Sequence, residues 1–187
     1  MKISLLTPRF KPSIGGIEIL VYETAKFLAS RQNLVKIYTS RLTGINEQRL
    51  SKVEIIEGIQ VFRSSSFPLL PIKGGMVNIM PSMISNVLRD KSDIYHSFGV
   101  GSFPSIMGHI KSKQKKPIVI TPLLYSTTEG KVAQTIIDKF SMNILGSAEK
   151  IIAQTKSEKK YLEGLGVKKE KIDRKSTRLN SSHEWIS

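Results

Sequence analysis

Short apolar runs alternate along this chain with longer segments whose apolar residues recur at helical spacing. The run at 3–6 predicts a buried first strand, and the segment 17–29 predicts a helix after it. The same alternation of runs and helical segments continues through the rest of the chain. Further strands are expected at 34–39, 53–56, 59–63, 93–96, 117–121 and 148–154, and further helices at 76–89, 104–110, 131–145 and 155–162.

Three segments need a separate interpretation. Pro81 lies inside the apolar periodicity of 76–89, so the helix begins either at residue 76 or at Pro81. Glu57 and Gly58 separate two strands and favour a β-hairpin. The segment 64–75 contains two prolines and two glycines, which predicts irregular structure.

Strands that alternate with helices predict an α/β fold, with a Rossmann-like parallel sheet flanked by helices. Ligands of such sheets bind at the carboxyl ends of the strands. His96 closes one predicted strand, while Gly15, Tyr125 and Thr155 follow others, so we expect all four at one edge. The basic segment 111–116 precedes a strand and is expected at the opposite edge, away from a substrate.

The turn between the first strand and the first helix is a candidate anion site. Gly15 and Gly16 allow close approach of a ligand to the backbone, and the N-terminus of the following helix favours a phosphate group. The turn lacks both the G-x-G-x-x-G spacing of dinucleotide-binding proteins and the Gly-Lys-Ser/Thr of a Walker loop. The alternative is a tight turn that needs a positive φ angle, and the turn alone favours this alternative.

Composition narrows the class of protein. A length of 187 residues fits one domain, and 40% hydrophobic residues support a packed core. The absence of cysteine excludes disulfides and a catalytic thiol, and with three histidines no metal site is expected. The first apolar run ends at Pro8 and is not a secretory signal, and no charge-free stretch is long enough to span a bilayer. A cytoplasmic location is expected.

The formal net charge is +14, which indicates an anionic partner such as nucleic acid, anionic lipid or a phosphorylated substrate. A solvated lysine-rich surface is the alternative. Nucleic acid is disfavoured because aromatic residues make up 7% and do not interleave with the basic runs. The apolar segment 67–72 and the excess of Lys and Arg favour peripheral contact with an anionic membrane, and a substrate loop is equally consistent with that segment.

Five short motifs occur in a characteristic order. They are Lys-Ile-Ser-Leu-Leu-Thr-Pro at 2–8, Pro-Ser-Ile-Gly-Gly-Ile-Glu at 12–18, Asp-Ile-Tyr-His-Ser-Phe-Gly at 93–99, Pro-Ile-Val-Ile-Thr-Pro at 117–122 and Ala-Glu-Lys-Ile-Ile-Ala-Gln-Thr at 148–155. In this order they resemble the N-terminal domain of a family-4 retaining glycosyltransferase of the GT-B fold. The resemblance covers about residues 1–173.

The resemblance implies roles for particular residues. Gly15 and Gly16 would face the diphosphate of a nucleotide-sugar donor, which needs no metal or other cofactor because helix dipoles and basic side chains stabilise the leaving group. The substrate cleft would hold Glu18, His96, Tyr125 and Ser126. The acceptor implied is a glycan or a lipid-linked molecule.

Three departures from the family pattern stand out. The family commonly has His-x-His where this chain has His96 and Phe98, which leaves one histidine. The usual histidine after Thr-Pro is replaced by Leu123, so the catalytic residue is unknown: either Tyr125 substitutes, the acceptor differs, or activity is reduced. Residues 174–187 show neither a strand pattern nor a helical period, where the family continues into a strand and a second domain.

The sequence therefore predicts the acceptor-side domain of a glycosyltransferase at 1–173, followed by a disordered tail at 174–187 that looks non-native. The donor-binding C-terminal domain is expected to be absent, and the chain alone is expected to be inactive. The alternative is a non-catalytic Rossmann-like ligand-binding module, which the missing loop histidine favours.

Overall fold

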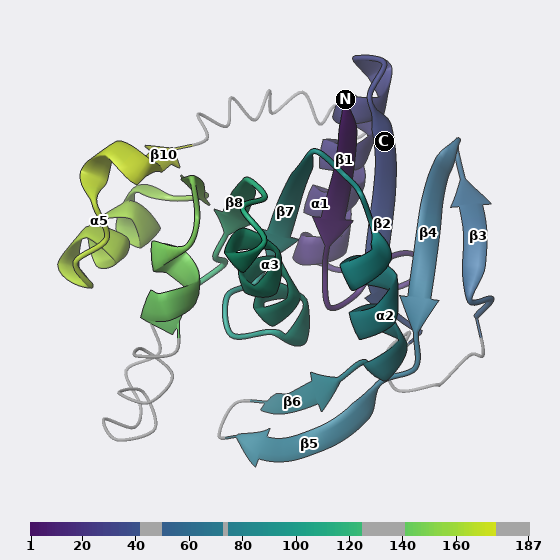
Figure 1. The fold of residues 1–187 in the computed structure, drawn as a ribbon. Helices are drawn as coiled ribbons and strands as arrows, with labels where there is room; N and C mark the ends of the chain where they lie inside the picture. The colour runs from purple at the N-terminus through teal and green to yellow at the C-terminus, as the bar shows by residue number, and fades with distance from the viewer. Residues whose placement is uncertain (42–49, 73–74, 125–140, 175–187) are drawn as a thin grey trace, which may run out of the picture.

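A computed structural model describes residues 1–41, 50–72, 75–124 and 141–174 of the chain. Within them, the main sheet has eight strands in the order β10-β9-β8-β7-β1-β2-β4-β3, as Figure 1 shows. All neighbouring strands are parallel except β3 and β4, which form an antiparallel hairpin. The strands are β1 (Lys2–Leu6), β2 (Leu34–Ser40), β3 (Val53–Ile56), β4 (Ile59–Ser64), β7 (Ile94–Phe98), β8 (Ile118–Thr121), β9 (Lys150–Ala153) and β10 (Ile172–Arg174).

Helices cover both faces of the sheet, which confirms the predicted α/β fold (Figure 1). Helix α1 (Gly16–Ser30) packs on one face, where Val21 and Ala25 join a core cluster with Leu5. The opposite face has its own core cluster, to which Leu6 contributes. Leu5 and Leu6 point to opposite faces because side chains alternate along a strand. The second face carries α2 (Pro81–Arg89), α3 (Phe103–Lys113), the helical residues 141–146 and α5 (Lys156–Gly164).

A second, two-stranded sheet projects beyond the carboxyl ends of the main strands (Figure 1). It consists of β5 (Phe67–Ile72) and β6 (Gly75–Ile79), paired antiparallel. The prediction of irregular structure at 64–75 was therefore wrong. Prolines are compatible with an edge strand because their missing N–H can face away from the partner. Among the described residues, β5 pairs with β6 alone.

Helix α2 begins at Pro81, the later of the two starts considered. The C-terminal end of α3, in contrast, differs from the prediction. Helix α3 runs to Lys113, so the segment expected to be a basic connector begins inside a helix. Lys111 is only 2% exposed, and its ammonium donates to the carbonyls of Leu88 (3.1 Å) and Asp90 (2.9 Å). Lys111 therefore ties α3 to the end of α2 and is not a surface cation.

The amino ends of the central strands are joined by a buried polar network around Asp90. Its carboxylate accepts hydrogen bonds from Ser4 Oγ (2.8 Å) and Lys36 Nζ (2.7 Å). Burial alone would raise the pKa of Asp90, but the hydrogen bonds from Lys36, Ser4 and Ser92 outweigh it and lower the pKa to about 2. The network lies at the amino ends of the strands, opposite to the edge where ligands of such sheets bind, and it connects β1 and β2 to the segment before β7.

The C-terminal part of the described chain adds two strands beyond β8. Thr155 caps α5 as predicted, since its side chain accepts a hydrogen bond from the N–H of Glu158 (3.0 Å). Strand β10 follows a single 3-10 turn at Lys169–Lys171 and pairs with β9. Arg174, which the sequence analysis assigned to the tail, is part of this sheet. The rest of the predicted tail lies outside the described residues.

Candidate functional site

The chain leaves the centre of the sheet in opposite directions at β1 and β7. From β1 it proceeds to β2 and β4 on one side, and from β7 to β8, β9 and β10 on the other. In open α/β sheets such a reversal opens a crevice at the carboxyl ends, because the loops that follow the two central strands turn away from each other. A ligand site is therefore expected at the ends of β1 and β7.

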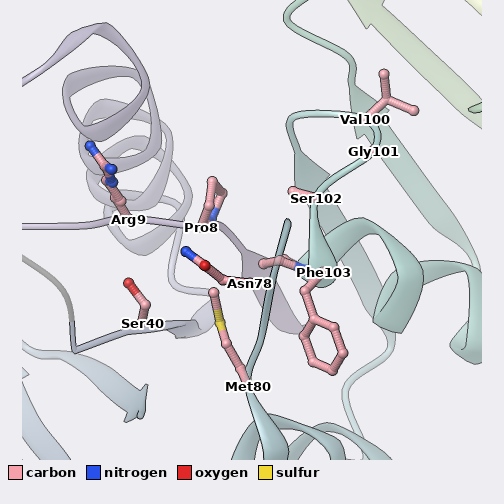
Figure 2. A pocket seen from close by; sticks show the side chains of 10 residues that line it. Pro8, Arg9, Ser40, Asn78, Met80, Val100, Gly101, Ser102 and Phe103 are labelled. Carbon is pink, nitrogen blue, oxygen red and sulfur yellow. The ribbon is translucent and has the colours of Figure 1, made fainter. Parts of the chain in front are cut away.

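A cavity of about 300 Å³ lies there, which we call the switch-point cavity (Figure 2). Four segments form its wall: the residues after β1, the last residue of β2, the junction of β6 with α2, and the turn between β7 and α3. The wall mixes apolar and polar side chains, with one charged group and no carboxylate among the described residues. Its members are Pro8, Arg9, Ser40, Asn78, Met80, Val100, Gly101, Ser102, Phe103 and Pro104.

The start of α3 borders this cavity. Gly99 and Gly101 have φ angles of 80° and 81°, a left-handed conformation in which glycine avoids the strain that a Cβ would add. This turn places Ser102 at the N-cap position, but its hydroxyl donates to the carbonyl of Gly99 (2.7 Å) and does not cap the helix. The positive end of α3 therefore contributes positive charge at the cavity, and Arg9 is the one charged residue in the described part of its wall.

Helix α1 begins at the same edge of the sheet, after the loop that follows β1. Gly15 is its N-cap with an extended φ of −176°, and Gly16 is its first residue, also outside the left-handed region. The alternative interpretation of this turn, a need for positive φ, was therefore wrong. The first intrahelical bond runs from the N–H of Ile19 to the carbonyl of Gly15 (3.0 Å), so the N–H groups of Gly16 and Ile17 precede the helical pattern.

Glu18 occupies part of the positive end of α1. Its side chain is buried, with 8% exposed, and a Cβ added at Gly15 would lie 2.5 Å from its Oε2 atom. Apart from the adjacent residues and the backbone of α1 itself, no described atom lies within 4 Å of a Cβ added at Gly16. Gly15 therefore makes room for a carboxylate of the protein itself, whereas the space beside Gly16 is open.

His96 lies apart from the switch-point cavity. Its Nε2 is 2.8 Å from Thr121 Oγ1, its ring stacks on Phe98 with centroids 4.1 Å apart, and 8% of the residue is exposed. His96 and Thr121 line a second cavity of about 810 Å³ on the α1 face of the sheet, together with apolar residues such as Val119 and Ile152. The structure thus separates His96 from the residues that line the switch-point cavity.

The loop after β8 carries no histidine, and part of it is described. Leu123 has a φ angle of 56° and packs partly buried against the α1-face core. The N–H of Leu124 donates to Glu158 Oε1 (2.8 Å), which anchors this loop to the start of α5. Tyr125 and Ser126, both predicted to lie in the substrate cleft, fall outside the described residues.

Several residues of the switch-point cavity were missed by the sequence analysis. Arg9 and Ser40 stand immediately after β1 and at the end of β2, so the rule that ligands bind at carboxyl ends could have found them. Asn78 could not be found this way, because it belongs to a hairpin that the sequence did not predict.

Comparison with solved structures found proteins of similar fold. The chain is similar to sucrose-phosphate synthase from Thermosynechococcus elongatus, with 16% identity and a TM-score of 0.66 over 92% of this chain and 47% of that one. It is similar to HepE from Anabaena in complex with UDP, with 18% identity and a TM-score of 0.61 over 93% and 43%. UDP-GlcNAc 2-epimerase from Methanocaldococcus jannaschii has 14% identity and a TM-score of 0.56 over 93% and 45%.

At these identities the similarity shows the fold alone, and this chain spans less than half the length of each of the three proteins. No curated protein matches the sequence. The sequence model of Glycosyltransferase Family 4 matches residues 14–174, which include α1 and every described strand after β1. The chain therefore belongs to glycosyltransferase family 4 and has the Rossmann-like architecture of a GT-B half.

Proposed function

We propose that this domain is the acceptor-binding half of a retaining glycosyltransferase that transfers a sugar from a nucleotide-activated donor to a hydroxyl group of a glycan or lipid-linked acceptor. One observation carries the proposal: a family-4 domain has a mixed polar and apolar cavity at the ends of β1 and β7. A sugar fits such a wall because its hydroxyl groups need hydrogen-bond partners and its ring faces pack on apolar side chains.

The donor diphosphate would lie at the start of α1, on the Gly16 side. There the free N–H groups and the positive end of the helix favour negative charge, while the Glu18 carboxylate already lies against Gly15. During transfer the bond between the anomeric carbon and the diphosphate oxygen breaks, and a bond from the acceptor oxygen forms. Charge that develops on the departing diphosphate would be stabilised by this helix end, without a metal. The acceptor proton leaves with the diphosphate or to solvent.

Two further considerations support this assignment. HepE, which shares the fold, was solved in complex with UDP, consistent with a nucleotide-sugar donor for the present domain. Arg9 is exposed at the switch-point cavity and makes no ion pair within the described part of the chain. Its guanidinium is therefore available to orient a polar acceptor.

A non-catalytic binding module is the second candidate. Leu123 favours it, because an apolar side chain packed against the core cannot transfer a proton or donate a hydrogen bond. Such a module would bind a sugar nucleotide or glycan without turnover, so a turnover assay separates the two candidates.

The experiment joins residues 1–174 to the C-terminal domain of a related family-4 enzyme and measures release of nucleoside diphosphate from a panel of nucleotide sugars, with a panel of glycan acceptors. We expect turnover that depends on the acceptor and is lost in Gly16→Val, whose side chain would enter the open space beside α1. Arg9→Gln should raise KM for the acceptor more than it lowers kcat. The chain alone should show no turnover.

Two results would count against the proposal. Binding of a nucleotide sugar without turnover by a folded chimera would favour the binding module. Normal turnover in Gly16→Val would show that the diphosphate does not contact the start of α1.

A further inference from the structure

A second cavity at the same edge of the sheet is strongly basic. It has a volume of about 260 Å³, and we call it the basic pocket. Three of its residues are cationic, two carry hydroxyl groups, and none is acidic. Its members are Arg41, Lys52, Arg63, Ser65, Phe67, Pro81 and Ser82.

Arg63 is the fixed point of the basic pocket. Only 2% of it is exposed, its Nε donates to Glu54 Oε1 (2.6 Å), and its Nη2 donates to the carbonyl of Lys11. The remaining nitrogen, Nη1, is buried and has no hydrogen-bond partner in the described part of the chain. A buried donor without a partner is costly, so Arg63 would gain from an acceptor supplied by a ligand.

The other two cations are held beside Arg63 by the backbone. The N–H of Arg63 donates to the carbonyl of Lys52 (2.8 Å), and the N–H of Arg41 donates to the carbonyl of Ser64 (2.9 Å). Neither Arg41 nor Lys52 forms an ion pair with a described residue. Glu54 offsets one of the three positive charges, which leaves a net charge of +2 in one small volume.

The start of α2 adds to this positive field. Pro81 and Ser82 are in the first turn of α2, and the N-cap residue Met80 supplies no side-chain hydrogen bond. The partial positive charge of the helix end therefore faces the same volume as the three cations. Like charges gathered in this way repel one another, and an anion of matching charge relieves the repulsion.

The basic pocket adjoins the switch-point cavity through two pairs of consecutive residues. Ser40 lines the switch-point cavity and Arg41 lines the basic pocket; Met80 lines the former and Pro81 the latter. The two cavities are therefore neighbours in the fold. We propose that the basic pocket binds a phosphate or pyrophosphate ester carried by the acceptor, while the acceptor's reactive hydroxyl lies in the switch-point cavity. This inference rests on the proposed function and adds the chemical class of the acceptor.

The test titrates the full chain with inorganic phosphate and with pyrophosphate by calorimetry, at constant low ionic strength. Arg41→Gln and Lys52→Gln each remove one cation, and Lys113→Gln, at the C-terminal end of α3, removes one cation far from the pocket. We expect both pocket variants to weaken binding about tenfold, as the loss of one charge-assisted hydrogen bond does, and Lys113→Gln to leave it unchanged. Circular dichroism checks that each variant is folded.

Vesicles distinguish the two sources of the phosphate group. If the ester belongs to a lipid, the chain sediments with phosphatidylglycerol vesicles but not with phosphatidylcholine vesicles. That sedimentation is then lost in Lys52→Gln and competed by inorganic phosphate. If the phosphate ester belongs to a soluble acceptor, inorganic phosphate still binds and the pocket variants still weaken its binding. The chain then sediments to the same extent with both kinds of vesicle.

No phosphate binding, or equal weakening by Lys113→Gln, would overturn the inference. The chimera separates this failure from that of the proposed function. If the chimera turns over but phosphate does not bind, the proposed glycosyltransferase activity stands and the proposal of an anionic acceptor is wrong. If phosphate binding depends on Arg41 but the chimera shows no turnover, the anion site stands and the proposed enzymatic function is wrong.

Discussion

Adding one carbon atom at each of two neighbouring glycines should have opposite effects on stability. At Gly15, a Cβ would lie 2.5 Å from Oε2 and 3.3 Å from the carboxyl carbon of Glu18, so the buried carboxylate has to move. At Gly16, a Cβ meets no described atom within 4 Å beyond the adjacent residues and the backbone of α1. Neither backbone is in the left-handed region, so conformational strain does not enter the comparison.

The magnitudes follow from the two environments. Gly15→Ala displaces a carboxylate from the positive end of α1, which costs roughly 0.3–1 kcal/mol, and replaces a favourable N-cap residue by a poor one at a cost of about 0.5–1 kcal/mol. Gly16→Ala makes no bad contact and restricts the unfolded chain, which stabilises by about 0.4–1 kcal/mol. In a domain of this size 1 kcal/mol shifts Tm by roughly 2–4 °C.

Thermal unfolding followed by circular dichroism measures both variants against the wild type. We expect Tm to fall by roughly 2–8 °C in Gly15→Ala and to stay constant or rise in Gly16→Ala. Gly15→Ala combined with Glu18→Ala is the control, because the second substitution removes the atom that the Cβ would strike. If Gly16→Ala destabilises as much as Gly15→Ala, the open space assigned to Gly16 is wrong, and so is its use as a probe of the ligand.

Three other predictions concern stability. Because the pKa of Asp90 is lowered to about 2, its ionised carboxylate contributes about 2 kcal/mol to the free energy of unfolding above pH 4, and this contribution is lost as pH falls toward 2. Urea titrations at several pH values should show this loss in the wild type, and a weaker dependence of stability on pH in Asp90→Asn. Gly108→Ala should be tolerated, since its Cβ would lie 3.5 Å from Ser97 Cβ, whereas Gly108→Leu should overpack the interface of α3 with the sheet and cost about 1–3 kcal/mol by chemical denaturation. Glu158→Gln should cost about 1–3 kcal/mol, because its carboxylate accepts from the N–H groups of both Leu124 and Gln154; an unchanged urea midpoint would contradict this.

The order of strands and helices could be predicted from sequence because each strand is a short apolar run between polar turns. The hairpin β5–β6 could not be predicted, since Pro68 and Pro71 are typical of loops. These prolines belong to a strand because β5 pairs antiparallel with β6, and that pairing has no signal in the local sequence. The length of α3 was underestimated for a related reason. Lys111 was interpreted as a surface charge, but its hydrogen bonds to carbonyls of a distant segment bury it.

The candidate site divides in the same way. Gly15, Gly16 and Glu18 follow from a local motif, and the structure places them together at the start of α1. The switch-point cavity depends on segments that meet only in the folded chain, so Asn78 and Phe103 gave no signal in the sequence. His96 shows a different error. The predicted strand ended at His96, whereas β7 continues to Phe98, and the direction of the His96 side chain, toward the α1 face, decides which cavity it lines.

Chemical labelling of the buried Lys111 can report local unfolding of α3. An acylating reagent reacts with an amine that it can reach. Lys111 is 2% exposed, and its amine makes three hydrogen bonds, to Leu88, Asp90 and Gln114. Exposed lysines such as Lys113 take up the label in the native state, whereas Lys111 takes it up only when α3 separates from the sheet. Mass spectrometry of the labelled peptides would therefore measure the fraction of molecules in which α3 has separated from the sheet, whereas spectroscopy reports an average over the whole chain.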